Sequence, residues 1–447
     1  MAHIYRTSVG TVTNSNRWVF SAWIKRGSVS TSSPQGIIST SQDNTNYAAV
    51  LFNQNNDKMY YKEIVAGSQK ELGAGTGIEF RDVNAWMHLF MEVDTSQATA
   101  SNRAKLFING VDIGWGSGTG VNQNTASGMQ RANATFNIGM AKISGTEHPF
   151  EGSMSYVYYI DGAAYGTYSA SDFGETDSTD GMWKIKTNPT IASYGNNGFL
   201  VLKDGSTITD QSPNSNNFTA SGTITNTKDC PDNNFCTMNP LDNYWFGGTF
   251  SNGNTVTVSP SSPYAMCTST LGMSSGKYYA EAKLQAGYPQ LKFGISCRPA
   301  QVSNETMAFS GSTCYSGSDG TLVLDGVTDT GWGSTFSVGD IIGIAVDCDN
   351  NRIYFSVNGT WQNSANPSSG SGYETIVAPA STSTGFYHFA WSDNKTNGGS
   401  TMQYNFGNGY FGTTAITSAG TNASGNGTFE YDVPTGFTAL CTKGINS

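Results

Sequence analysis

Glu92 and Asp94, two carboxylates one residue apart, have the spacing most suggestive of chemistry. They lie in "WMHLFMEVD" (residues 86–94), and an extended chain places residues i and i+2 on the same face. Paired carboxyls act as nucleophile and acid in glycoside hydrolysis, and a retaining mechanism needs them about 5 Å apart. The alternative, which we favour, is that Glu92 faces solvent and Asp94 starts a turn.

A second group of carboxylates lies in "DFGETDSTDG" (residues 172–181). Hard oxygen ligands at this density suit Ca²⁺. The candidate metal ligands are Asp172, Glu175, Asp177 and Asp180. We expect no cofactor, with Ca²⁺ at these four residues as the alternative. A similar pattern, "DCDNN" (residues 347–351), lies where a hairpin turn already favours Asp and Asn.

No other catalytic pattern stands out in the sequence. The four histidines, His3, His88, His148 and His388, are far apart and show no metal-ligand spacing. His88 lies beside Trp86 in a predicted strand, which favours a packed or surface residue over a general base. No Gly-x-Ser-x-Gly elbow or Cys–His pair stands out, and no phosphate-binding loop is present. We therefore predict no catalytic residues and no enzyme activity.

Aromatic residues next to predicted loops are better candidates for binding. Tyr and Trp stack on sugar faces and give rigid contact area. Trp115 lies in a Gly-rich loop (residues 114–128), Tyr165 and Tyr168 follow "IDG", and Trp361 follows an Asn-Gly pair. The alternative for each is that it covers one end of a β-sandwich.

Alternating apolar residues identify the strands that would position these side chains. Two stretches, residues 86–112 and 338–361, share one plan: an apolar strand ending in Val-Asp, a polar turn, a second alternating strand and Asn-Gly. A period of two predicts strands half buried against a core, so each stretch is a predicted hairpin. The residues expected to face the core are Leu89, Met91, Val93, Leu106, Ile108, Ile342, Ile344, Val346, Ile353, Phe355 and Val357, with Trp18, Phe20, Ala22 and Ile24 on an earlier strand.

Composition favours an all-β protein with antiparallel sandwiches. The chain has 447 residues with 53 Gly and only 13% charged residues, whereas helical bundles need runs of Ala, Leu, Glu and Lys. The net charge of −10 disfavours nucleic acid and anionic membrane surfaces as partners. The longest apolar run, residues 341–346, is too short to span a bilayer, and "MAHIYRTSVG" lacks the layout of a signal peptide. We expect a soluble protein with no membrane insertion.

The seven cysteines are scattered and odd in number, which argues against a disulfide framework. Cys297 and Cys348 fall within strand patterns and are expected to be small buried side chains. Cys230 and Cys236 flank "PDNNF", and their pairing is the one alternative that the spacing leaves open. The sequence therefore predicts assembly in a reducing compartment.

The first part of the chain resembles the concanavalin A-like, laminin-G-type lectin fold. The resemblance rests on "FSAWIKR", "WMHLFMEVD", "KLFINGVDIG" and "FEGSMSYVYYIDG", and covers roughly residues 4–165. Glycoside hydrolases of that fold carry a Glu-x-Asp-x-(x)-Glu motif on one strand. Positions 96 and 97 here are Ser and Gln, so the third carboxylate is absent. The resemblance therefore implies a binding domain rather than a hydrolase.

The next tract resembles structural proteins of tailed bacteriophages, marine ones especially. It includes "DFGETDSTDGMWKIK" (residues 172–186), "YGNNGFLVL" (194–202) and "DQSPNSNNFT" (210–219), the last a polar loop that returns to a strand. "CTMNPLDNYWFGGTFSNGNTVTV" (236–258) resembles the start of the second domain in those proteins. The resemblance implies a virion protein.

The last part of the chain resembles the SPRY domain, a bent antiparallel sandwich used for protein recognition. "GKYYAEAKL", "GDIIGIAVDCDNNRIYFSVNG" and "YNFG" occur in the order of that family. The predicted organisation is a laminin-G-type domain with an extension over residues 1–225, a linker over 226–235 and a SPRY-like domain over 236–447.

These resemblances imply a non-enzymatic surface protein of a tailed-phage virion, assembled in the host cytoplasm. As a tail fibre or receptor-binding adhesin it would recognise host-surface glycan or protein, contact other virion proteins and form a homo-oligomer, commonly a trimer. As a capsid decoration or head-fibre protein, it would lay one domain on the shell instead. Two alternatives of other classes are a polysaccharide depolymerase acting through Glu92 and Asp94, and a SPRY scaffold that binds a peptide.

Overall fold

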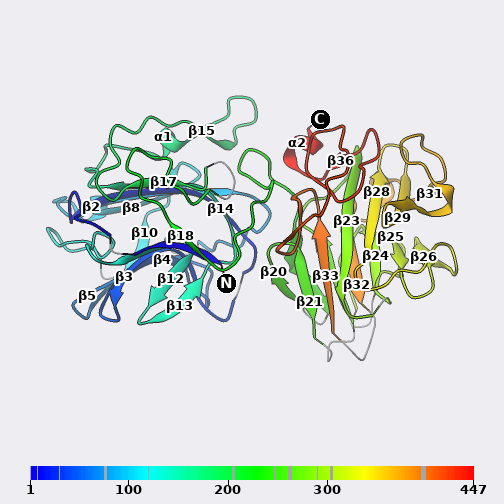
Figure 1. The fold of residues 1–447 in the computed structure, drawn as a ribbon, viewed down its shortest axis with the longest axis horizontal. Helices are drawn as coiled ribbons and strands as arrows, with labels where there is room; N and C mark the ends of the chain where they lie inside the picture. The colour runs from blue at the N-terminus through cyan, green and yellow to red at the C-terminus, as the bar shows by residue number, and fades with distance from the viewer. Residues whose placement is uncertain are drawn as a thin grey trace. The chain divides into compact units, whose positions relative to one another are not determined.

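The computed structural model describes residues 2–446, except 8, 30, 75–77, 119, 204–206, 246–247, 260–263, 289, 303–305 and 394–398. The chain divides into two compact units, residues 1–226 and 227–447. Strands hold 44% of the residues and helices 4%, which confirms the predicted all-β class. Figure 1 shows each unit as layered sheets, whose strands pair antiparallel except for β23 with β36.

The first unit packs a six-stranded sheet on an eight-stranded sheet (Figure 1). The six-stranded sheet has the order β17 (Phe199–Val201), β14 (Gly152–Asp161), β2 (Arg17–Arg26), β7 (Met87–Asp94), β8 (Ala104–Ile108) and β9 (Val111–Asp112). The eight-stranded sheet has the order β10 (Trp115–Gly118), β6 (Ser68–Ala74), β5 (Met59–Val65), β4 (Asn46–Phe52), β3 (Gln35–Asp43), β11 (Thr135–Ile138), β1 (His3–Arg6) and β18 (Thr219–Ser221). Two strand pairs, β12 (Met140–Ile143) with β13 (Thr146–Pro149) and β15 (Gly174–Thr176) with β16 (Trp183–Ile185), complete the unit.

The core of the first unit lies between these two sheets, as the alternation predicts. On β2, Trp18, Phe20, Ala22 and Ile24 are all buried in one cluster, which also contains the predicted inward residues of β7 and β8. The intervening residues of β2 face the other side of the sheet. They are buried as well, so this sheet carries packed side chains on both faces.

The second unit packs a seven-stranded sheet on a nine-stranded sheet. The seven-stranded order is β19 (Met238–Trp245), β22 (Ala265–Ser269), β32 (His388–Asp393), β24 (Lys292–Ser296), β25 (Ser312–Ser316), β26 (Thr321–Leu324) and β27 (Val327–Asp329). The nine-stranded sheet contains β20 (Thr249–Ser251), β21 (Thr255–Val258), β33 (Ser400–Asn405), β23 (Lys277–Ala286), β28 (Ile341–Asp347), β29 (Arg352–Val357), β30 (Thr360–Trp361), β31 (Glu374–Thr375) and β36 (Thr438–Ala439). A last pair joins β34 (Tyr410–Phe411) to β35 (Thr414–Ala415).

The predicted hairpin of the second unit is β28–β29, paired in register from Ile342–Val357 to Asp347–Arg352. Its alternating residues enter the core between the sheets, together with the predicted small thiols Cys297 and Cys348. Asn351 and Asn358 have positive φ, a backbone conformation that Asn tolerates better than most residues. The polar turn residues therefore fix the register that buries the apolar ones.

The segment predicted as a linker packs onto the second unit. Phe235 is buried and forms an isolated antiparallel β-bridge with Cys441. The backbone N–H of Asn234 donates to Thr442 Oγ1. All seven cysteines are free thiols, so Cys230 and Cys236 are not joined.

Helix is confined to α1 (Ala170–Phe173), α2 (Thr442–Ile445) and short 3₁₀ turns in the described chain. No described helix has the length and apolar character needed to cross a membrane.

Truncating the centre of the second core tests this packing. Ile344→Ala should lower the free energy of unfolding of the second unit by about 3 kcal/mol, because Ile344 is fully buried and its removal leaves a cavity. Val338→Ala is the control: Val338 is 51% exposed, and its loss should cost less than about 0.5 kcal/mol. Urea unfolding monitored by tryptophan fluorescence measures both, and equal effects would contradict the assignment of Ile344 to the core.

Candidate functional site

The outer face of the six-stranded sheet is covered by the chain that follows it. We call residues 163–194 the first cover; it includes α1, β15 and β16. Phe173 from α1 packs on Phe90 and Tyr158 of the sheet, with ring centroids 5.8 and 5.1 Å apart. This second apolar layer leaves the centre of the sheet face without access to solvent.

Glu92 and Asp94 lie on this covered face. The backbone N–H of Gly166 donates to Glu92 Oε1 at 2.6 Å, and that of Tyr165 donates to Asp94 Oδ2 at 3.1 Å. Arg17 Nε lies 3.3 Å from Asp94 Oδ2. Only 4% of Glu92 and 0% of Asp94 is exposed. The expectation that Glu92 faces solvent is therefore wrong, because the first cover lies over it.

The pKa values of Glu92 and Asp94 are shifted in opposite directions. Burial raises the pKa of Glu92 to about 7 against the opposing effect of the Gly166 N–H. Burial also pushes the pKa of Asp94 upward, but hydrogen bonds from Ser96, Tyr165 and Gln97 outweigh it and hold that pKa below its usual value. The Ser96 N–H lies 3.0 Å from Asp94 Oδ1, so Asp94 does start a turn, as predicted. A pair separated in this way is suited to acid–base chemistry, but the first cover leaves both carboxyls almost without contact with solvent.

His88 is a packed residue in the same layer. Its ring lies between the indoles of Trp23 and Trp183, with centroids 5.2 and 6.0 Å away. Trp183 Nε1 donates to His88 Nδ1 at 3.2 Å, which assigns the ring proton to Nε2, 2.8 Å from Ser21 Oγ. Burial lowers the pKa of His88 to about 3, so it stays neutral near pH 7.

The predicted calcium ligands have partners within the chain. Asp172 caps α1 by accepting the Ser169 N–H at 2.7 Å, and Lys184 Nζ lies 2.9 Å from carboxylate oxygens of both Asp177 and Asp180. Glu175 lies 3.8 Å from Lys186 Nζ. No group of three or more His, Cys, Asp or Glu that would hold a metal occurs among the described residues. Ca²⁺ at these residues stays a prediction, to which this arrangement adds no support.

The four predicted binding aromatics are at least half buried. Trp115 packs against the first core, and Tyr165 is held beside Asp94 by its backbone. Tyr168 is buried, and its hydroxyl accepts the Ala192 N–H at 3.1 Å. Trp361 packs edge-on against Tyr279 in the second unit, with centroids 6.3 Å apart. The rings of Trp115, Tyr168 and Trp361 pack against other residues of the chain, and a binding role for the four aromatics stays a prediction.

The second unit repeats the covering arrangement with different residues. We call residues 429–441 the second cover; Phe429 and Phe437 pack over Tyr279 and Tyr354 on the outer face of the nine-stranded sheet. Glu281 lies beneath it with 0% exposure. Its carboxylate accepts the N–H groups of Glu430 at 2.9 Å and Tyr431 at 2.8 Å. Asn405 Nδ2 and the Tyr279 hydroxyl donate as well, yet burial dominates and raises the pKa of Glu281 to about 7.

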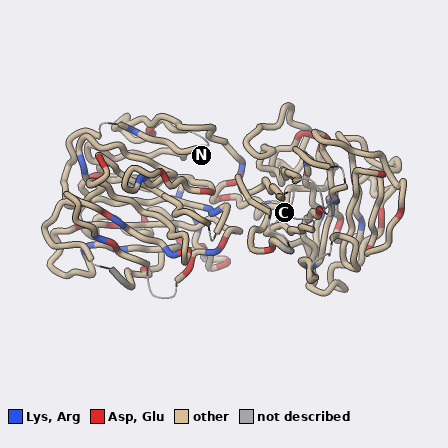
Figure 2. Tube along the Cα trace, turned by 90° about the horizontal axis from the view of Figure 1, so that it is seen from below, with Lys and Arg blue, Asp and Glu red and all other residues tan. Residues whose placement is uncertain are grey.

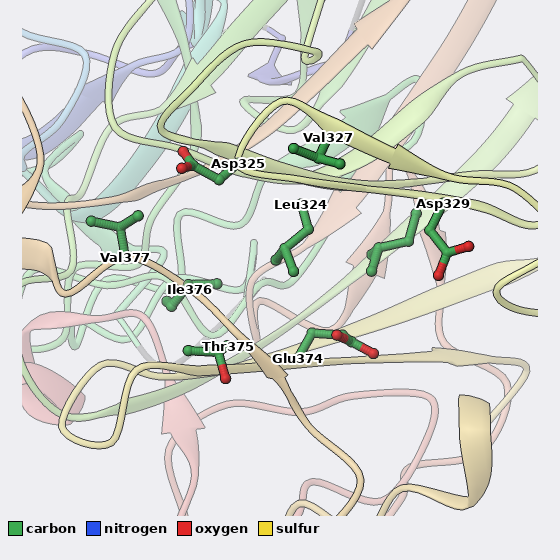
Figure 3. Close-up of a pocket in the computed structure, with 9 residues that line it drawn as sticks. Leu324, Asp325, Val327, Asp329, Glu374, Thr375, Ile376 and Val377 are labelled. Atoms are coloured by element: carbon green, nitrogen blue, oxygen red, sulfur yellow. The ribbon is translucent and has the colours of Figure 1, made fainter.

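The second unit also has a groove of about 600 Å³ between the β26–β27 hairpin and β31. Leu322, Leu324, Val327 and Ile376 provide its apolar wall. Figure 3 shows the carboxylates of Asp329 and Glu374 at one end of the groove and that of Asp325 at the other. This groove is the open concave surface that we regard as the candidate binding site of the second unit.

Sequence reasoning missed the groove and both covers. The groove combines β26, β27 and β31, and no local pattern shows that a hairpin and a strand some 50 residues later approach each other. The sequence does carry a weak signal for the second cover. On β23, Ala280, Ala282 and Leu284 face the core, so Tyr279 and Glu281 must face outward. An aromatic beside a Glu on an outer face suggests that another segment packs over it.

Comparison with known families agrees with this geometry. Residues 3–164 match the concanavalin A-like lectin/glucanases superfamily, and residues 277–385 match the SPRY domain. The chain thus joins a concanavalin A-like domain to a SPRY domain. Lectin-like and SPRY sandwiches indicate a binding role. No curated protein matches the chain.

Several solved structures are similar to parts of this chain at low sequence identity. The SPRY domain of human HERC1 has 17% identity and a TM-score of 0.29, covering 37% of this chain and 96% of its own. A second human SPRY domain has 16% identity and a TM-score of 0.26, covering 34% and 91%. Domain 4 of AbnA, a GH43 extracellular arabinanase from Geobacillus stearothermophilus in complex with arabinotriose, has 19% identity and a TM-score of 0.27, covering 36% and 67%.

Removing the indole that covers His88 tests the first cover. Trp183→Ala should raise the pKa of His88 from about 3 towards the ordinary value of about 6.5, because water then reaches the ring. Trp183→Phe should keep the low pKa, since it retains the burial and removes only the Nε1 donor. NMR titration of the His88 ring protons measures both, and a pKa unchanged by Trp183→Ala would contradict this role of the cover.

The buried Glu281 predicts a pH dependence of stability. The pKa of Glu281 is about 7 in the folded protein against 4.5 for the ordinary carboxyl, so the folded state binds more protons between these values. The contribution of Glu281 to the free energy of unfolding should therefore be largest below pH 4.5 and fall by about 3 kcal/mol as the pH rises to about 7.

Glu281→Gln is the matched variant for this dependence. It should be less stable at every pH, because its amide group faces an N–H donor that the carboxylate accepts. Its stability should also vary less between pH 4.5 and 7 than that of the parent protein. Glu92 contributes in the same direction, so the comparison is made between urea unfolding midpoints of the two proteins. Identical slopes would contradict the raised pKa of Glu281.

Proposed function

We propose that the protein is a non-enzymatic surface protein of a tailed-phage virion that attaches to host-surface glycan or protein. The observation that carries this proposal is the burial of Glu92 and Asp94 under the backbone of Tyr165 and Gly166. A glycosidase needs both carboxyls in contact with the sugar. Since the first cover occupies that space, the loops and open strand edges are the surfaces left for binding.

The virion assignment is supported by the tract that resembles phage structural proteins. Residues 172–219 supply much of the first cover, the edge strand β17 and the first residue of the edge strand β18. The tract is therefore part of the folded domain and not a detachable linker. The free thiols are compatible with assembly in a reducing cytoplasm. On the virion we favour a tail fibre or adhesin, as a homotrimer, over a capsid decoration protein.

A hydrolysis assay separates the adhesin from a depolymerase. Purified full-length protein, incubated with extracellular polysaccharide from candidate host bacteria, should bind it or the cell surface without releasing new reducing ends. The Glu92→Gln variant should behave in the same way, because Glu92 touches no substrate. Reducing ends released by the parent protein and lost in Glu92→Gln would establish the depolymerase instead.

The location of the protein tests the virion assignment independently. Gold-labelled antibody against the purified chain should decorate the tail tips of phage particles, and the free protein should compete with phage adsorption to host cells. Labelling of the head shell would favour the decoration protein, and particles without the protein would contradict the virion assignment.

A further inference from the structure

We propose that the groove beside β27 binds an extended peptide segment carrying lysine or arginine, which adds to the open edge of β27 as a further strand. The proposal goes beyond the virion assignment and does not depend on it. It rests on the strand edge, on the apolar wall of the groove and on the local charge.

The outer edge of β27 is free for pairing. β27 ends the strand order of the seven-stranded sheet, and in the described chain it pairs only with β26. A two-residue turn, Asp325-Gly326, joins the two strands, with positive φ at both residues. Leu324 and Val327 are the closing pair, so the N–H and C=O of the next residue, Thr328, point away from β26. These are the groups to which an incoming strand would hydrogen-bond.

The face of the hairpin towards the groove is apolar and unfilled. In the pairing register, Val327 lies opposite Leu324 and Asp329 opposite Leu322, so these four side chains share one face. Val327 is 71% exposed, the largest fraction among the exposed large hydrophobic residues described. A strand added to β27 would cover Val327 with an apolar side chain on the same face.

The excess of carboxylates in the second unit favours a positively charged partner. Between Arg298 and Lys395 the sequence holds nine carboxylates and one cation, Arg352. Arg352 is engaged elsewhere: its guanidinium stacks 4.4 Å from the centre of the Tyr373 ring and donates to the Gly370 carbonyl. In Figure 2 the acidic positions outnumber the basic ones in the second unit. A cationic segment would therefore meet an uncompensated negative potential.

Two of the groove carboxylates are available for such a segment. Trp332 Nε1 donates to Glu374 Oε1 at 2.7 Å, which fixes this side chain and leaves Oε2 without a described partner. The backbone of Asp329 pairs with Leu322, but its carboxylate makes no hydrogen bond or ion pair with any described residue. Asp325 differs, because it accepts the Gly311 N–H at 2.5 Å and the Ser310 hydroxyl at 2.9 Å. Asp329 and Glu374 are thus the specific partners for lysine or arginine side chains.

The same features disfavour two other occupants. A second copy of the chain pairing β27 to β27 would bring its own Asp329 and Glu374 close to these carboxylates, and like charges repel. A neutral sugar would need an aromatic face for stacking, and none of the residues that line the groove is aromatic.

The test uses full-length protein and a dye-labelled, capped nonapeptide of alternating valine and lysine, followed by fluorescence anisotropy. The peptide should bind saturably and more weakly at high salt, and its valine–glutamate counterpart should not bind. The double variant Asp329→Asn/Glu374→Gln should weaken binding by about tenfold, the loss expected for two solvent-accessible ion pairs. Thr328→Pro, which removes the outward N–H, should weaken it at least as much, whereas Thr328→Val should not.

Backbone N-methylation of alternate residues in the peptide removes its donors without changing the protein, so this arm remains decisive even if a variant folds poorly. Loss of binding on N-methylation supports strand addition. Unchanged affinity on N-methylation, equal binding of the glutamate peptide, or no effect of the double variant would each overturn the proposal. A concentration-dependent dimer that Thr328→Pro dissolves in analytical ultracentrifugation would identify a second copy as the occupant instead.

Discussion

Both units depend on a buried carboxylate that accepts backbone N–H groups from a covering segment. Glu92 accepts the Gly166 N–H in the first unit, and Glu281 accepts those of Glu430 and Tyr431 in the second. The N–H groups offset part of the cost of burying each carboxyl, whose pKa burial still raises to about 7, and a buried carboxyl left without them would cost more. Each cover and the carboxylate beneath it therefore require each other, and this mutual need holds an otherwise open sheet face closed.

The closed faces determine which surfaces can act. A sheet face bearing Glu92, Asp94 and His88 has the residue types of an active site, but the aromatic layer of α1 and β16 covers it and buries all three side chains. In the function that we propose, molecular recognition falls to loops, strand edges and the groove beside β27. Acidic residues exceed basic residues by more in the second unit than in the first. The two sandwiches therefore offer partners different surface charge, although in both a segment covers the outer face of one sheet.

The sequence predicts the parts of this structure that are set by local periodicity. The hairpins at residues 86–112 and 338–361, the inward face of β2 and the small buried thiols follow from alternation and turn residues. The burial of Glu92 does not follow from local periodicity, because it depends on packing by the segment around Gly166, 74 positions away. Trp115, Tyr168 and Trp361 illustrate the same limit: a loop-like neighbourhood predicts exposure, but long-range packing places each ring against a core or cover.

Amide hydrogen exchange at Gly166 and Tyr431 tests the sealed faces most directly. These amides lie in segments whose sequence resembles exposed loops, yet each donates to a buried carboxylate. The account predicts that both exchange as slowly as amides in the central strands β7 and β23. Exchange as fast as in the exposed turns would contradict it, because the covers would then open readily and expose Glu92 and Asp94 to a substrate.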